Sequence, residues 1–405
     1  MIFEFDDSIA RHARMKVVGV GGAGGNAVNR MIEEDLESVE FVSINTDAQA
    51  LRRSRSHLKI QIGKDLTRGL GAGARPEIGR QAIAENEEDV RQALEQSDLV
   101  FITAGMGGGT GTGAAPVVGQ IAREQGALCI AIVSKPFRFE GRRRMRHADI
   151  GLRELRACVD TMIVVPNERL LSVVGEGTSF RDALKKADEV LLHATQGISD
   201  LISVTGEINV DFADVRTVMS NRGAALMGTG EASGEERAIE AAQQAICSPL
   251  LEDVSINGAT GVLVNITGGS DLAIDEVTTI NSIVQEAAGE EVELIFGAVH
   301  DPALEGCVRV TVIATGYGEV EEDMFLEPTD DVVPLHLARP RLVSDPAYSE
   351  FALETPADVG VEVTSDFGVE VTSHFGPQLG GEALTLADPG LADLEIPTFI
   401  RRQMD

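Results

Sequence analysis

Short, largely apolar runs alternate with helical patterns between residues 15 and 316, and this alternation limits the fold more than any other feature of the sequence. Runs without a polar residue at every second position are typical of parallel strands buried on both faces of a sheet. Helix-period segments at Ala23–Glu34, Pro76–Gln96 and Gly113–Gln125 separate several of the runs. The pattern therefore predicts a doubly wound α/β domain. The six expected strands are Lys16–Val20, Glu40–Ile44, Leu58–Ile62, Asp98–Thr103, Leu128–Val133 and Thr161–Val165.

A long helical pattern at Ser179–Ile202 follows, with apolar residues three and four positions apart. We expect this segment to join the first domain to a second, smaller α/β unit at about 221–316. The strands expected in that unit are Gly261–Ile266, Glu293–Ala298 and Arg309–Ala314.

The acidic residues are concentrated after Gly316. The formal net charge is −31, and Tyr317–Ala392 alone holds 16 Asp and Glu against 2 Arg, which gives −14. Acidic and small residues with scattered Pro predict a disordered linker, in which we interpret the tandem octapeptide Gly360–Phe367 and Gly368–Phe375 as replication slippage rather than an adhesive β-segment. Because phosphate backbones are bound by clustered Lys and Arg, the acidity argues against nucleic acid as a partner.

The sequence also indicates the compartment. No apolar run approaches the ~18 residues of a membrane span, and the N-terminus lacks a basic and apolar signal pattern. The four cysteines are far apart, without CxxC or HExxH motifs, so we expect neither a metal site built from side chains nor a disulfide framework. We expect a cytoplasmic protein without direct membrane insertion. The cysteines are Cys129, Cys158, Cys247 and Cys307.

A first glycine cluster, Gly19–Asn26, follows the first expected strand and opens a helix. Gly19, Gly21 and Gly24 match the GxGxxG pattern, in which glycines let backbone N–H groups approach a phosphate at a helix N-terminus. The pattern alone leaves two alternatives open, a dinucleotide or another phosphate ligand.

A second cluster, Gly105–Gly113, has six glycines in nine residues and again lies between a strand and a helix. Successive N–H groups can point inward there as an anion-binding nest, and Thr110 and Thr112 add hydroxyls. Two phosphate cradles in one sheet favour a nucleoside di- or triphosphate. Because the chain has no GxxxxGK[ST] lysine, we infer that Mg²⁺ neutralises phosphate charge. A third glycine-rich stretch, Gly69–Ala74, is either a phosphate-covering loop or a surface loop without contacts.

At Gly107–Gly113 the sequence GGGTGTG resembles the signature of the FtsZ family, the bacterial tubulin-like cell-division GTPases. The resemblance covers most of residues 15–316. Its supporting segments are Gly19–Arg30, Asn45–Asp47, Leu66–Ala74, Pro136–Gly141, Pro166–Asn167, Asn209–Asp214 and Arg309–Gly316.

The resemblance implies a tubulin-like fold that binds GTP and GDP with Mg²⁺ held mainly through the phosphates. It implies guanine contacts at Asn26 and Asp188, and a carboxylate at Asp188 explains guanine selectivity because it accepts from N1–H and the exocyclic amine together. Ribose and phosphate contacts are implied at Glu140, Arg144 and Asn167. The phosphate loops implied are Gly21, Gly22, Ala72, Gly73, Ala74, Gly105, Gly107, Gly108, Gly109, Thr110, Gly111, Thr112 and Gly113.

The resemblance also implies that catalysis is completed between two subunits. Asp211 and Asp214, with Asn209, would meet the nucleotide of the next molecule and orient the attacking water. Such a head-to-tail contact does not close on itself and generates a filament, which implies GTP hydrolysis that drives turnover of the cytokinetic (Z) ring at midcell.

The last residues regain apolar and basic character, and they resemble the family's partner-binding peptide. A docking peptide on a long tether fits membrane-adaptor division proteins such as FtsA or ZipA. The expected anchor residues are Leu394, Ile396, Pro397, Phe399, Ile400 and Arg401. The alternative is a C-terminal segment that binds no partner.

Two residues depart from the family pattern. Leu184 stands where an aromatic ring commonly packs on guanine, and Arg75 stands where Asn is usual. Two rival functions also remain at this stage, an NAD-dependent dehydrogenase based on GxGxxG and a polymerising paralogue with little hydrolysis.

The sequence predicts six segments. They are residues 1–14 as an extension, 15–178 as the GTP-binding domain, 179–220 as the central helix and acidic loop, 221–316 as the C-terminal α/β domain, 317–392 as the linker and 393–405 as the docking peptide.

Overall fold

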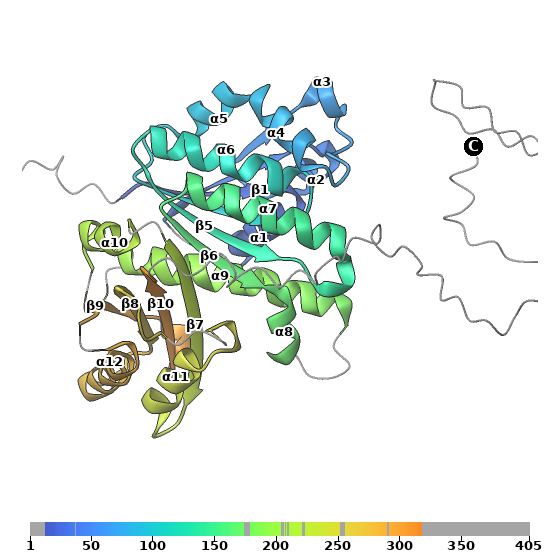
Figure 1. Cartoon of the computed structure of the whole chain (residues 1–405). Coiled ribbons are helices and arrows are strands. Elements are labelled where there is room, and N and C mark those ends of the chain that lie inside the picture. Colours follow the sequence, from blue (N-terminus) through green and yellow to red (C-terminus); the bar gives the residue numbers. More distant parts are fainter. Residues whose placement is uncertain are drawn as a thin grey trace, which may run out of the picture. The chain divides into compact units, whose positions relative to one another are not determined.

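The computed structural model describes residues 13–36, 38–173, 179–203, 206, 208, 210–220, 223–251, 256–289 and 291–317. Ten strands within these residues form one mixed sheet in the order β3-β2-β1-β4-β5-β6-β7-β10-β8-β9 (Figure 1). Asn209, nearly all of the expected linker and the docking peptide lie outside the described residues.

The first six strands run parallel in the order 3-2-1-4-5-6, which is a Rossmann order. They confirm the doubly wound prediction. The strand order reverses between β1 and β4, and ligands of such sheets bind at the carboxyl ends of the strands at this point. The strands are β1 (Met15–Val20), β2 (Val39–Asn45), β3 (Leu58–Gln61), β4 (Leu99–Gly105), β5 (Leu128–Lys135) and β6 (Thr161–Pro166).

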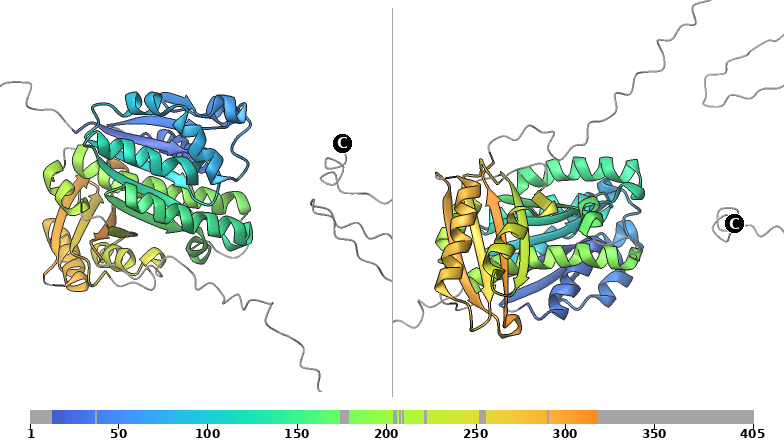
Figure 2. Two further views of the ribbon diagram at one scale, coloured as in Figure 1. Left: turned by 45° about the horizontal axis from the view of Figure 1, so that its top comes forward. Right: turned by 90° about the horizontal axis from the view of Figure 1, so that it is seen from below.

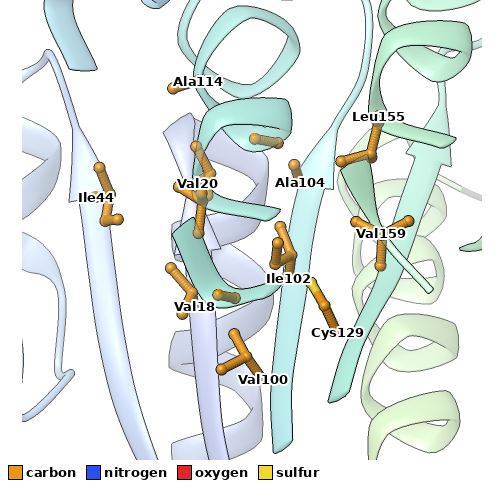
Figure 3. Close-up of a cluster of buried hydrophobic side chains, with 14 of the residues drawn as sticks. Val18, Val20, Ile44, Val100, Ile102, Ala104, Ala114, Cys129, Leu155 and Val159 are labelled. Atoms are coloured by element: carbon orange, nitrogen blue, oxygen red, sulfur yellow. The ribbon is translucent and has the colours of Figure 1, made fainter. Parts of the chain in front are cut away.

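One face of this parallel sheet is covered by four helices (Figures 1 and 2). Val18, Ile102 and Ala104 of the sheet pack there with Ala114 and Leu155 of the helices (Figure 3). Burial on both faces is why the central strands β1, β4, β5 and β6 are apolar nearly throughout, whereas the edge strand β3 is largely exposed. The helices are α4 (Pro76–Ala84), α5 (Glu87–Leu94), α6 (Thr110–Glu124) and α7 (Arg142–Cys158).

The opposite face is covered by α1 (Gly21–Glu33) and the long helix α9 (Phe180–Ser203). Leu191 and Ile198 of α9 belong to one apolar cluster with Ile130 of β5 and Leu263 of β8. The predicted helix at 179–202 therefore exists, and it packs on strands from both halves of the chain.

The C-terminal half extends the same sheet. β7 (Gly223–Ser233) pairs with β6 over three residues, and β10 (Cys307–Thr315) lies antiparallel between β7 and β8 (Gly261–Gly268). β9 (Glu293–His300) pairs parallel with β8. Helices α11 (Arg237–Ile246) and α12 (Ile274–Ala288) share a separate apolar cluster with β8 and β10.

Two features differ from the sequence-based expectation. The segment Pro76–Gln96 is two helices because Asn86 interrupts it, with its side-chain oxygen accepting from the Gly63 N–H at 3.0 Å. Strand β7 was not predicted because its sequence GAALMGTGEAS has no β-branched run. Its glycines permit close helix packing, since a Cβ at Gly228 would lie 1.9 Å from the Ala245 carbonyl oxygen.

The remaining elements are short. They are α2 (Ala48–Arg53), α3 (Lys64–Thr67), η1 (Arg138–Glu140), α8 (Asn167–Val173), α10 (Phe212–Met219), η2 (Pro249–Leu251) and η3 (Pro302–Leu304). Across the described ranges, no helix combines the length and apolar character that crossing a membrane requires.

Arg237 joins α11 to the start of α12, and its side chain is only 8% exposed. Its guanidinium donates to Asp271 at 2.5 Å and to both carboxylate oxygens of Glu276 at 2.6 and 2.9 Å. We predict that Arg237→Ala lowers the free energy of unfolding by about 2 kcal/mol, below the usual loss for a fully buried pair because both acids are partly exposed.

Chemical denaturation of the full chain measures this loss. Arg309→Ala is the matched control, because Arg309 pairs with the exposed Glu231 at 2.9 Å and should cost under ~1 kcal/mol. Equal losses in the two variants would contradict the prediction.

Candidate nucleotide site

Two helix N-termini meet at the reversal point of the sheet. α1 begins at Gly21 directly after β1, and α6 begins at Thr110 after the loop that follows β4. Neither helix has a side-chain N-cap hydrogen bond or an acidic residue in its first turn. Their first N–H groups are therefore available to an anion.

Most glycines of the two clusters are packed too closely against neighbouring atoms to accept a Cβ. A Cβ on Gly21, whose φ is +76°, would lie 2.8 Å from the Gly111 nitrogen. A Cβ on Gly24 would lie 2.2 Å from the Thr103 carbonyl oxygen, and one on Gly105 would lie 2.5 Å from the Ala23 Cβ. The glycines thus hold the first loop against β4 and against the second loop.

Three other glycines border open space. A Cβ on Gly22, Gly25 or Gly108 would meet no atom within 4 Å. These positions leave the backbone uncovered, and Gly22 also lies in the first turn of α1, where N–H groups lack an intrahelical partner.

The two threonines of the second loop already have partners. The Thr110 hydroxyl lies 2.7 Å from that of Thr46, and the Thr112 oxygen accepts from the Gly107 N–H at 2.9 Å. Both hydroxyls therefore help to fix the loop.

The third glycine stretch contacts the second. Ala72 is buried, and its Cβ lies 2.7 Å from the position of a Cβ on Gly109. Gly73 and Ala74 are exposed beside it, each with positive φ. The third glycine stretch is thus a loop that contacts the second cluster rather than a surface loop without contacts.

The predicted base contacts come from α1 and α9, which pack together. Asn26 is exposed on α1, and Arg30 lies one turn further along the same helix. Burial raises the pKa of Asp188 to about 7, and only the Arg30 charge opposes this rise. A half-buried carboxylate without a hydrogen-bond donor among the described residues is suited to a ligand that brings donors. Leu184, 38% exposed, precedes Asp188 by one turn.

The predicted ribose contacts lie around the start of α7. Glu140 accepts from the Phe137 N–H at 3.0 Å and pairs with Arg144 at 2.8 Å. Gly107 approaches the Arg144 carbonyl, because a Cβ there would lie 2.5 Å from it. Asn167 is buried at the end of β6, and its side-chain oxygen has no hydrogen-bond partner among the described residues. The structure therefore places Glu140 and Arg144 beside the second loop.

The predicted catalytic aspartates lie at the opposite edge of the sheet, where the parallel strands begin. Asp211 precedes α10 and Asp214 lies in its first turn, and both are exposed. Arg216 of α10 donates to the Gly126 carbonyl at 2.7 Å, just before β5 begins. Strands of six to eight residues, about 20 Å long, separate this edge from the glycine loops. One molecule thus does not bring the two groups together.

Sequence reasoning assigned no role to the residues that follow β2. Asn45 and Asp47 line a pocket together with Gly21, Gly22 and Asn26. The Asp47 carboxylate caps α2, accepting from Gln49 and Ala50 N–H groups. Their position at the carboxyl end of a strand next to β1 was the available signal.

Two family models match this chain. Residues 14–175 match the model of the Tubulin/FtsZ family GTPase domain, and residues 223–318 match that of the FtsZ family C-terminal domain. Two similar solved structures are of FtsZ from M. jannaschii, one an empty dimer and the other a tryptophan-to-tyrosine mutant.

The empty dimer is 46% identical, with a TM-score of 0.73, and the match covers 76% of this chain and 90% of that one. The mutant is 47% identical, with a TM-score of 0.73, and the match covers 76% of this chain and 92% of that one. CetZ2 from Haloferax volcanii, solved as a GTPγS-bound protofilament, is 22% identical with a TM-score of 0.66. That match covers 76% of this chain and 95% of that one, and it supports the fold alone.

We predict that Asp188→Asn stabilises the ligand-free protein at pH 8 by about 1–3 kcal/mol. Because the folded pKa of about 7 lies above the ordinary 3.8, the ionised carboxylate costs stability above pH 7. The gain should shrink as the pH falls from 7 towards 4, where the native Asp188 is protonated. Unfolding curves across this range measure it, and a gain independent of pH would contradict the assignment.

Proposed function

This chain belongs to the Tubulin/FtsZ family, and on that premise we propose that it is a cell-division GTPase that assembles head to tail into filaments. The observation that carries the proposal is the pair of uncapped helix N-termini, α1 and α6, meeting at the reversal point of the sheet. The family's GTPase domain covers this site.

We propose that GTP lies across these two helix ends. The N–H groups near Gly22 and Gly108 bind phosphates, and the exposed loop at Gly73 and Ala74 borders the terminal one. Asp188 accepts hydrogen bonds from guanine, and Asn26 also contacts the base. The side-chain oxygen of Asn167, which has no partner among the described residues, supports a contact with the sugar. The other nucleotide-loop residues hold this backbone in place.

Mg²⁺ fits this arrangement as a phosphate-held ion. The described residues contain no cluster of three acidic, His or Cys side chains that can hold a metal. Mg²⁺ commonly keeps several waters and takes only one or two protein ligands besides phosphates. The oxygens of Asn45 and Asp47, in the pocket beside Gly21, are candidates. When bound, the ion neutralises phosphate charge.

We propose that hydrolysis takes place at the joint between two subunits. Asp211 and Asp214 are exposed and form no side-chain hydrogen bond or ion pair with described residues, so their carboxylates are available. Stacking one molecule's α10 edge on the next molecule's glycine loops brings acid and phosphate together. A carboxylate there orients the attacking water and accepts its proton. The intact acids favour this over a paralogue with little hydrolysis.

We further propose the cellular setting that the family implies. The filaments form the Z ring at midcell in the cytoplasm, and Leu394–Arg401 docks on membrane adaptors such as FtsA or ZipA. The separate family matches at 14–175 and 223–318 support a GTP-binding domain at 15–178 and a C-terminal domain at 221–316. The segments before, between and after these two domains stay predictions.

We predict that Asp214→Ala leaves GTP binding nearly intact and lowers hydrolysis by at least ~10²-fold, the scale of one lost acid–base residue. Phosphate release and light scattering on the same sample measure turnover and assembly together. GTP-dependent scattering without phosphate release is the expected result, and unchanged turnover would refute the role of Asp214.

A mixing experiment tests whether the site is shared. Gly22→Asp places a carboxylate at the open α1 N-terminus, so it should repel phosphate without a clash, and Gly22→Ala is its steric control. In a 1:1 mixture with Asp214→Ala, about a quarter of random joints pair an intact nucleotide site with an intact acid. Turnover should recover towards that fraction. No recovery from two folded variants would indicate a site within one subunit.

We predict that deleting Leu394–Asp405 spares GTP hydrolysis and removes adaptor binding. The deleted residues follow the expected linker and lie far in sequence from both halves of the proposed joint. Co-sedimentation of filaments with an adaptor on vesicles measures binding, and phosphate release is the internal control. Retained adaptor binding would place the docking segment elsewhere.

A further inference from the structure

Helix α7 is strongly basic in an acidic chain. Its sequence RRRMRHADIGLRELRAC holds six Arg, one Asp and one Glu, whereas the whole chain has a net charge of −31. Such a concentration of positive charge on one element attracts an acidic partner.

The acids of α7 are already paired with bases beside the helix. Asp149 lies 3.0 Å from the Lys135 ammonium, and Glu154 pairs with Arg80. By contrast, Arg143, Arg146 and Arg153 form no ion pair with any residue that the structure describes. Their charge is therefore uncompensated within the described part of the chain.

These three arginines share one face of the helix with an apolar residue. At 100° per residue, Arg143, Arg146, Ile150 and Arg153 fall within roughly a quarter of the helix circumference. All four are exposed, and Ile150 is 49% exposed. We name these four residues the basic stripe. The helix packs elsewhere on its surface against α6, which lies beside it (Figure 1).

The described chain ends near the C-terminal end of α7. Tyr317 is buried just after β10, and antiparallel pairing places Ala314 opposite Leu226, near the start of β7. Gly223 of β7 pairs with Thr161 of β6, three residues after α7 ends at Cys158. The chain therefore leaves the sheet about two strand spacings, roughly 10 Å, from the strand that follows α7.

The segment that leaves there complements the basic stripe. Gly318–Val332 reads GEVEEDMFLEPTDDV, with seven acids, no Lys or Arg, and Met324–Leu326 in its middle. The acidic–apolar–acidic order of this segment thus complements the basic–apolar–basic order of the basic stripe. Fifteen extended residues span up to about 50 Å, whereas α7 is about 25 Å long, so the segment can reach along the whole helix.

We propose that Gly318–Val332 docks along the basic stripe of its own subunit. The Met324–Leu326 cluster covers Ile150, the acids before it face Arg153, and those after it face Arg146 and Arg143. The tether to the docking peptide then starts beside the N-terminal end of α7, next to Gly107. Without docking, the tether starts at the other edge of the sheet, where the parallel strands begin.

Disulfide trapping in the full chain tests this placement. Ile150→Cys is combined with Phe325→Cys in a chain whose Cys158, Cys247 and Cys307 are Ser, and oxidation is followed on non-reducing gels. The matched control is Glu293→Cys with Phe325→Cys, because exposed Glu293 also lies two strands from β10, on the other side. We expect an intramolecular bond at position 150 at least ~10-fold faster than at 293. The advantage should vanish in 1 M salt, where the screening length falls to ~3 Å.

Charge reversal gives a second readout. Arg146→Glu with Arg153→Glu should slow the 150–325 bond at least ~5-fold and expose Glu319–Glu327 to a Glu-specific protease. Arg52→Glu with Lys59→Glu, also exposed and unpaired among described residues, should change neither. Equal bond rates at 150 and 293, rates insensitive to salt and charge reversal, or bonds only between two chains would each overturn the proposal. Arg146 and Arg153 lie outside the proposed nucleotide contacts, so GTP turnover should persist in the charge-reversal variant.

Discussion

The packing of one glycine loop directly on another is the contact on which the rest of the structure depends. Gly21 meets Gly111 with no room for a Cβ, and Gly24 meets the end of β4 in the same way. This contact brings the N-termini of α1 and α6 to one place at the reversal point of the sheet. The electrostatic property of the site, free N–H groups on two converging helices, therefore follows from a steric requirement on the backbone.

Much of the fold was predictable because the central parallel strands are buried on both faces and are therefore apolar nearly throughout. All six parallel strands were predicted to within one or two residues of their final bounds, including β3, which is largely exposed at the sheet edge. Strand β7 was not predicted, because its glycines are required by close contacts with Ala241 and Ala245 of α11, which are distant in sequence. The break between α4 and α5 at Asn86 was not predicted, because it involves a hydrogen bond to Gly63, which is 23 residues away in sequence.

The candidate site was predictable to a different degree. Its glycine loops were visible as motifs, but their division into packed and open positions was not, since only three dimensions show that Gly22 and Gly108 face space. Asp188 had no local signal, because its raised pKa comes from partial burial, which only the folded structure shows. The separation of Asp214 from the loops depends on the sheet, which places α10 at the edge where the parallel strands begin.

The partial burial of Asp188 also connects nucleotide binding to proton release. With its pKa raised to about 7, this carboxyl is partly protonated in the ligand-free protein at neutral pH. Guanine, as proposed, donates two hydrogen bonds and therefore selects the ionised form. Loading with nucleotide then releases part of a proton to the solvent, and the heat of binding depends on the buffer that takes it up.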